Sequence, residues 1–316
     1  MKKQMVIMAA VAPLLALNLA AQQAPPAAAA SLAQRIAHTN PANFRASKSV
    51  HGGAGQLDFA GLLNFNQFDT NMHFVHRGVL QPGGGIGAHF HNQCEEMFVI
   101  LDGEAQFTID GRTSVLKGPA GAPVRLGGSH AIYNHTDKPV QWLNLNVTVR
   151  KGVYDNFDLG DPRVGVPIDP IPTFISMRLD RQLARPMNAA AGAKGTVQYR
   201  RLLDPAIFRT AWAYVDHLVL APGSATATQA LADIGETFYV VAGSGSITVG
   251  AETAPITSGD AIPVRMGEAK SFANAGTDAL ELLVVGVARD ADRKFEMVGS
   301  AQGGRGGRAG RGGRGN

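Results

Sequence analysis

The sequence of 316 residues predicts an all-β protein made of two antiparallel barrels joined by a linker. The first observation behind this prediction is local, because short β-rich runs alternate with turn residues from Met97 to Leu116. Strands that recur at intervals of about 8–12 residues between turn signals are typical of a sandwich or a barrel. The Asp102-Gly103 and Asp110-Gly111 pairs are expected to close tight hairpins, since glycine accepts a positive φ.

The second observation is an internal repeat at an offset of 140 residues, which keeps one register over more than fifty positions. Identical residues coincide at turns and within strands, among them Pro82 with Pro222, Glu96 with Glu236, Arg125 with Arg265 and Asn134 with Asn274. A repeat of this length indicates a duplicated domain.

The repeat sets the predicted domain boundaries. The chain divides into a signal peptide (1–24), an N-terminal extension (25–54), a first barrel (55–150), a linker (151–195), a second barrel (196–290) and a disordered Gly/Arg-rich tail (291–316). Within the linker, the stretch from Ile175 to Ala191 looks helical and is expected to pack beside the barrels.

The N-terminus has the layout of a secretory signal. Lys2 and Lys3 precede an apolar run from Met5 to Ala16, and small residues and prolines follow that run. The run is shorter than the roughly 20 residues that a transmembrane helix needs. We expect export to the periplasm or the extracellular space, without a membrane span.

The C-terminus is rich in glycine and arginine and has no large apolar side chain to bury, which predicts disorder. The net charge of +4 includes the positive charges of two lysines in the signal and four arginines in the tail. Without these six charges, the folded body between the two ends is near neutral. The tail also lacks the interleaved aromatic residues that stack on bases. A specific nucleic-acid partner is therefore not expected.

The segment from Gly83 to Gly103, GGGIGAHFHNQCEEMFVILDG, resembles the first motif of the cupin family, and Gly127, His130 and Asn134 resemble the second. Arg125 stands where that family usually has proline. The resemblance covers both repeats, so the chain is similar to a bicupin. It implies two cupin-type double-stranded β-helix (jelly-roll) barrels.

The motif predicts a metal site formed by His89, His91, Glu96 and His130. Side chains alternate along a strand, so His89 and His91 share one face. A cation would remove the cost of burying the Glu96 carboxylate. Three imidazole nitrogens and one carboxylate oxygen suit one divalent ion of iron, manganese, nickel, copper or zinc, and the sequence does not select among these. Glu95 is expected to face away from the site.

Other polar residues near the motif have predicted roles. Asn134 is placed to orient His130 or a bound water from the second shell of the site. The residues proposed to line a substrate pocket are Arg77, Trp142, Asn144 and Asn146, with an outward, solvated face as the alternative for all four. Cys94, the single cysteine, is either a buried spacer or a thiolate ligand.

The second repeat has lost the predicted ligands. At the 140-residue offset, Gln229, Leu231 and Lys270 replace the three histidines, and only Glu236 remains. Lys270 either pairs with Glu236 in place of the metal, or both side chains point to water.

Cupins with three histidines and one glutamate include dioxygenases, oxalate-type decarboxylases, lyases, isomerases and hydrolases. The resemblance therefore implies a metalloenzyme that acts on a small oxygen-rich substrate molecule, of the dioxygenase, decarboxylase or lyase type. The alternative is a non-catalytic bicupin that binds a ligand or has a structural role. Exposed sheet edges also make a homodimer a candidate assembly.

Overall fold

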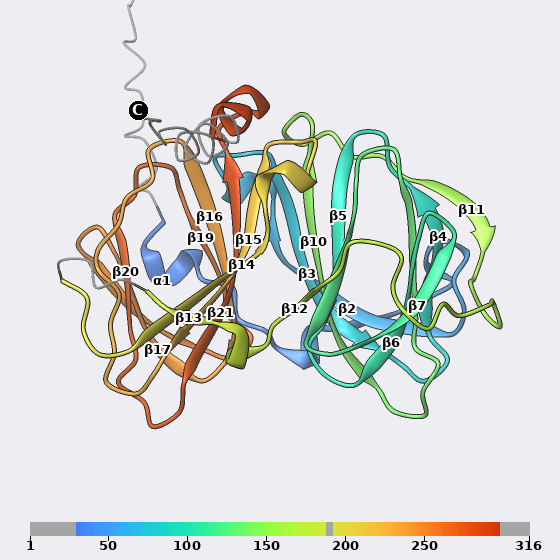
Figure 1. The fold of residues 1–316 in the computed structure, drawn as a ribbon, viewed down its shortest axis with the longest axis horizontal. Coiled ribbons are helices and arrows are strands. Elements are labelled where there is room, and N and C mark those ends of the chain that lie inside the picture. The colour runs from blue at the N-terminus through green and yellow to red at the C-terminus, as the bar shows by residue number, and fades with distance from the viewer. Residues whose placement is uncertain (1–29, 188–191, 298–316) are drawn as a thin grey trace, which may run out of the picture. The chain divides into compact units, whose positions relative to one another are not determined.

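A computed structural model of the chain describes residues 30–187 and 192–297 (Figure 1). The predicted signal peptide lies outside these ranges, as does residue 298 onward of the predicted tail. Within the described residues, no helix is long and apolar enough to cross a membrane. The fold is all-β, as predicted, with short helical segments at α1 (Leu32–Arg35), η1 (Pro41–Asn43), η2 (Val50–Gly52), η3 (Phe65–Gln67), η4 (Arg181–Leu183) and η5 (Pro205–Ile207).

The first barrel consists of two antiparallel sheets. The larger sheet has the order β1 (Arg45–Lys48), β2 (Gln56–Asn64), β3 (Met72–Leu80), β10 (Val140–Thr148), β5 (Cys94–Ile100), β8 (Ala120–Val124) and β12 (Met177–Arg178). The smaller sheet has the order β11 (Phe157–Asp161), β4 (Gly85–Phe90), β9 (Ser129–Tyr133), β6 (Glu104–Ile109) and β7 (Arg112–Lys117). The apolar core includes Phe98, Phe107 and Trp142, each about 1% exposed.

The second barrel repeats this plan with fewer strands. Its larger sheet has the order β13 (Arg185–Pro186), β14 (Val197–Leu203), β15 (Trp212–Leu220), β21 (Leu280–Ala288), β16 (Ile234–Ala242) and β19 (Ala261–Val264). Its smaller sheet has the order β18 (Glu252–Thr257), β17 (Ser244–Val249) and β20 (Lys270–Ala273). The segment that matches β4 at the repeat offset makes only isolated bridges, at Ala225 and Gln229.

The two Asp-Gly turns differ in what they connect. Asp110 and Gly111, both with positive φ, close the hairpin between β6 and β7, as the sequence predicts. Gly103 also has a positive φ of 57°, but β5 and β6 belong to different sheets. The prediction of a hairpin at Asp102-Gly103 is therefore wrong, and this turn carries the chain from one sheet to the other.

The segments outside the repeats belong to the barrels more closely than the predicted boundaries imply. The N-terminal helix α1 lies against the second barrel (Figure 1), where the Leu32 amide donates to Glu252 and Arg35 pairs with Glu268 at 2.7 Å. The linker supplies β11 and β12 to the first barrel and β13 to the second.

The linker and the tail also depart from their predicted structures. The predicted helix from Ile175 to Ala191 is absent over residues 175–187, which instead form β12, η4 and β13, because their backbone pairs with the barrel sheets. Residues 291–297 are helical rather than disordered. They are tied down by the fully buried Lys294, whose ammonium group donates to the Phe208 carbonyl.

The large sheets of the two barrels share an apolar core that draws residues from both, such as Val75 and Leu143 from the first barrel and Val215 and Leu283 from the second. Glu95 faces away from the metal motif, as expected, and is fully buried at this junction. Its carboxylate accepts hydrogen bonds from both the amide and the hydroxyl of Thr210, at 2.8 and 2.7 Å. The Glu95 carboxylate thus links the two barrels through hydrogen bonds.

Candidate metal centre

The fold brings the four predicted metal ligands together inside the first barrel. His89 lies on β4 opposite His130 on β9, His91 directly follows β4, and Glu96 lies on β5 of the facing sheet. None of the four residues is more than 2% exposed. Their potential ligand atoms all lie within 4.8 Å of one another.

The imidazole Nε2 atoms converge on one point. The Nε2 of His130 lies 3.0 Å from that of His89 and 3.3 Å from that of His91. The Glu96 oxygens lie 3.6 Å from the His91 Nε2 and 3.9 Å from the His130 Nε2. Ligand atoms that each lie about 2.0–2.2 Å from one shared ion adopt separations of this size.

The hydrogen bonds of the histidines also suit a metal. The Nδ1 of His89 lies 2.8 Å from the Gly87 carbonyl, and the Nδ1 of His91 lies 2.5 Å from the Asp155 carbonyl. A carbonyl can only accept, so each Nδ1 carries the proton and each Nε2 presents a lone pair. Burial lowers the pKa of His89 to about 3 and that of His130 well below its usual value, so both rings are neutral.

Two predicted pocket residues turn out to hold the carboxylate ligand. Asn144 and Asn146 point into the barrel, and their Nδ2 atoms donate to Glu96 Oε1 at 2.7 Å and to Glu96 Oε2 at 2.8 Å. Each carboxylate oxygen therefore has one fixed amide donor and keeps a lone pair for a cation. Trp142 shares this inward face but is packed against Phe98, with ring centroids 5.9 Å apart.

The predictions for Arg77 and Asn134 are wrong. Arg77 lies on the opposite face of β3 from the barrel interior and donates to the Tyr239 hydroxyl of the second barrel at 2.9 Å. Asn134 does not contact His130, because its amide nitrogen donates to the Leu80 and Lys138 carbonyls and closes a loop. The Nδ1 of His130 has no hydrogen-bond partner among the described residues.

Sequence reasoning missed two aromatic neighbours of the ligands. The His51 ring stacks on His89 with centroids 3.9 Å apart, and its Nδ1 lies 2.6 Å from the Asp158 carboxylate. His51 has a φ of 50°, a left-handed conformation that is uncommon outside glycine and is found at functional sites. Tyr154 packs beside His91, with ring centroids 5.5 Å apart. His51 and Tyr154 lie outside the two repeats, so the 140-residue offset does not identify them as neighbours of the ligands.

Cys94 is buried and accepts a hydrogen bond from the Asn146 amide at 3.1 Å. Its sulfur also lies within 4.8 Å of possible ligand atoms of His91 and Asp155. Burial raises the pKa of the Cys94 thiol, so the protonated form is favoured. This favours the buried-spacer interpretation over a thiolate ligand.

In the second barrel, an ion pair stands where the first barrel has its metal motif. Lys270 contacts the Glu236 carboxylate, and the Tyr214 hydroxyl donates to the same carboxylate at 2.8 Å. Both members of the pair are less than 10% exposed. The alternative in which both point to water is therefore wrong.

Both halves of the chain match the family model described as "Cupin domain", over residues 76–146 and 216–286. This chain is a bicupin. The two matched segments are offset by the same 140 residues as the repeat, so the bicupin architecture predicted from the motifs is confirmed. The clustered histidines and glutamate form a buried group of side chains that could hold a metal ion.

Three of the known proteins similar to this bicupin are named for oxalate or salicylate. The oxalate-binding protein of Thermotoga maritima is 29% identical over 95 residues, which are 30% of this chain and 78% of the relative. Oxalate decarboxylase of Bacillus subtilis is 15% identical with a TM-score of 0.55, covering 81% of this chain and 76% of that one. Salicylate 1,2-dioxygenase of Pseudaminobacter salicylatoxidans is 17% identical with a TM-score of 0.58, covering 77% and 78%. At such identities the two structures show a shared fold.

Proposed function

We propose that the first barrel is a metal-dependent enzyme site for a small oxygen-rich organic molecule, and that His89, His91, Glu96 and His130 hold the metal. The observation that carries this proposal is the convergence of imidazole lone pairs and one carboxylate in a buried site. Packing alone does not require three imidazoles around a carboxylate, because such polar groups are costly to bury without a partner.

The chain's own residues pre-organise this site. The Gly87 and Asp155 carbonyls fix which nitrogen of His89 and His91 carries the proton. Asn144 and Asn146 hold the Glu96 carboxylate in one orientation. A bound divalent transition metal would supply a Lewis acid at this position. Burial of the ligand side chains excludes bulk water and strengthens electrostatic interactions within the site.

The substrate class rests on chemistry and on the relatives. No cationic side chain is hydrogen-bonded to the four ligands among the described residues, so the metal would be the main positive charge available to an acidic substrate. The names of the similar proteins refer to oxalate and salicylate, which are small carboxylates. A decarboxylase or dioxygenase that acts on such an acid is the reaction type we favour, with a lyase as the third possibility.

The test is turnover by the purified protein after reconstitution with each of Fe²⁺, Mn²⁺, Ni²⁺, Cu²⁺ and Zn²⁺. Oxalate, salicylate and gentisate are supplied in turn, and the release of carbon dioxide and the uptake of dioxygen are recorded. We expect turnover with one metal and its loss in the His130→Ala variant. The Asn92→Ala variant is the matched control, because Asn92 is exposed and makes its contacts to Asp155 through its backbone amide.

A second candidate function is binding without turnover, favoured by the similarity to an oxalate-binding protein. The same reconstituted samples distinguish the two candidates. Saturable binding of oxalate that requires His130, with no change in the bound molecule over hours, would replace the enzyme proposal with this one.

We also propose export to the periplasm or beyond. The support is the sequence pattern of Lys2, Lys3 and the apolar run from Met5 to Ala16. Cell fractionation with N-terminal sequencing of the recovered protein tests this proposal. A mature N-terminus near residue 24 is expected, and an intact Met1 on protein found only in the cytoplasm would contradict it.

A homodimer is proposed from the exposed apolar side chains of the edge strand β11. Phe157 and Leu159 on this strand are 45% and 51% exposed. Exposed strand edges and apolar patches are commonly covered when another protein chain binds over them. Light scattering after gel filtration is expected to give twice the mass of the chain, and the mass of one chain would contradict the proposal.

A further inference from the structure

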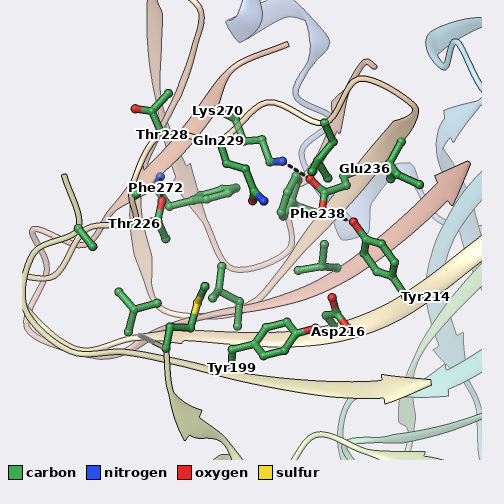
Figure 2. Close-up of a pocket in the computed structure, with 18 of the residues that line it drawn as sticks. Tyr199, Tyr214, Asp216, Thr226, Thr228, Gln229, Glu236, Phe238, Lys270 and Phe272 are labelled. Carbon is green, nitrogen blue, oxygen red and sulfur yellow. Dashed lines mark hydrogen bonds and ion pairs between the residues drawn. The ribbon is translucent and has the colours of Figure 1, made fainter. Parts of the chain in front are cut away.

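The second barrel, which has lost its metal ligands, contains a cavity of about 550 Å³ (Figure 2). Sites for small organic molecules span about 300–1,000 Å³. The cavity is lined by strands β14, β15 and β16 and by the segment around Gln229, and it lies where the first barrel has its metal motif. Its lining includes Glu236 and Lys270, the counterparts of Glu96 and His130.

The two repeats differ in sequence around this cavity. Asn144 and Asn146 of the first barrel become Val284 and Gly286 at the 140-residue offset. A Cβ atom on Gly286 would lie 2.3 Å from the Tyr214 ring, so this glycine is what allows Tyr214 to reach Glu236. The segment that corresponds to β4 is no longer a continuous strand, which leaves one side of the barrel open.

The charges in the cavity cancel in pairs. Lys270 pairs with Glu236, and Arg201 pairs with Asp216. No other charged side chain is among the described lining residues. An ionic ligand would bring an uncompensated charge into this site or separate a buried pair, and either change is costly. The lining therefore selects against ions.

The rest of the lining suits an amphipathic molecule. Apolar side chains form much of the wall, among them Leu218, Leu231, Phe238, Phe272 and Val284. Figure 2 shows the side chains of Gln229 and Lys270 reaching into the cavity from the same side. Among the described residues, the side-chain amide of Gln229 makes no hydrogen bond, and the Lys270 ammonium group contacts Glu236 alone. Donors at both residues are thus available to a ligand oxygen.

We propose that this cavity, lined by Gln229, Glu236, Phe238 and Lys270, is a second binding site that takes an uncharged organic molecule with an apolar body and hydroxyl or carbonyl oxygens. The oxygens accept hydrogen bonds from Gln229 and Lys270, and the body packs on the two phenylalanines. The first barrel would thus act on an acid at its metal, while the second barrel binds a neutral molecule without the help of a metal.

The test uses three probes of similar shape, benzyl alcohol, benzoate and benzylammonium, with binding to the full-length protein followed by saturation-transfer NMR. Benzyl alcohol is expected to bind, and the two ions are expected to bind at least about tenfold more weakly. Val284→Phe should abolish binding by filling the cavity. Ala227→Trp, at a partly exposed lining position, should also fill the cavity, and it serves as the test if Val284→Phe fails to fold.

Two controls make the result specific. Ala230→Trp places the same bulk on a neighbouring exposed residue that does not line the cavity, and it should leave binding unchanged. His130→Ala, which removes a predicted metal ligand of the first barrel, should also leave binding unchanged. Binding that persists in both filled variants, that is lost in His130→Ala, or that favours benzoate would overturn the proposal.

Discussion

The Asn146 side chain donates one hydrogen bond to Glu96 Oε2 at 2.8 Å and another to the Cys94 sulfur at 3.1 Å, so a single amide fixes both neighbours. Side chains that hold a metal ligand typically contribute 10–100-fold to metal affinity. Asn146→Ala should therefore weaken metal binding by about that factor without unfolding the barrel. Competition with a chromogenic chelator measures the affinity, with Asn92→Ala as the control. Unchanged affinity would mean that Glu96 does not need this donor.

Glu95 should matter for stability rather than for metal binding. Its carboxylate accepts from the Arg209 and Thr210 amides of the second barrel, and glutamine would present an NH₂ group to these donors. We expect Glu95→Gln to lower the free energy of unfolding by about 3 kcal/mol, the usual effect of breaking a buried charged hydrogen bond. Urea denaturation measures this change, and Glu296→Gln, at an exposed pair, should have little effect. Equal midpoints for the two variants would contradict this role.

The pair of Lys270 and Glu236 gives a prediction for the second barrel. Lys270→Met leaves the Glu236 carboxylate buried with Tyr214 as its remaining partner, and unfolding should become easier by about 3 kcal/mol. The double variant Lys270→Met with Glu236→Gln should recover part of that loss, because the uncompensated charge is gone. Thermal denaturation of the three proteins checks this. A Lys270→Met variant that melts like the parent would show that the pair does not stabilise the barrel.

The buried carboxyl group of Asp216 should make the stability of the protein depend on pH. Burial raises its pKa from 3.8 to about 6, although Arg201 opposes the shift. Between these two values the folded state binds more protons than the unfolded state, so the Asp216 contribution to stability falls as the pH rises from about 4 to about 6. The difference in unfolding free energy between the parent and Asp216→Asn should fall over this range and be flat above it. A difference that rises with pH would contradict the assignment.

The sequence predicts best what is encoded locally. The spacing of His89, His91 and Glu96 predicts that their side chains converge from two consecutive segments of the chain. The repeat offset predicts the second barrel, and it gives the pairing of Lys270 with Glu236 as one of two alternatives. Strand alternation also placed Asn144 and Asn146 on one face. It did not give their role, because their contact with Glu96 depends on the register between β5 and β10.

The errors arise where tertiary structure decides. The sequence places Arg77 on the strand before the motif and so suggests the pocket, but its face of β3 is covered by the second barrel. The cavity in the second barrel could not be predicted, since only the fold brings its lining residues on β14, β15 and β16 together. His51 reaches His89 from an N-terminal segment far from the motif in sequence, through a left-handed backbone that no pattern indicates.

Elemental analysis of the purified protein beside a His89→Ala/His130→Ala double variant tests the metal centre of the first barrel most directly. We expect about one equivalent of iron, manganese, nickel, copper or zinc per chain in the parent and none in the variant, because the second barrel has an ion pair in place of the ligands. A parent protein that contains no metal and takes up none would contradict a metal centre in the first barrel. Metal retained in the double variant would place the site elsewhere.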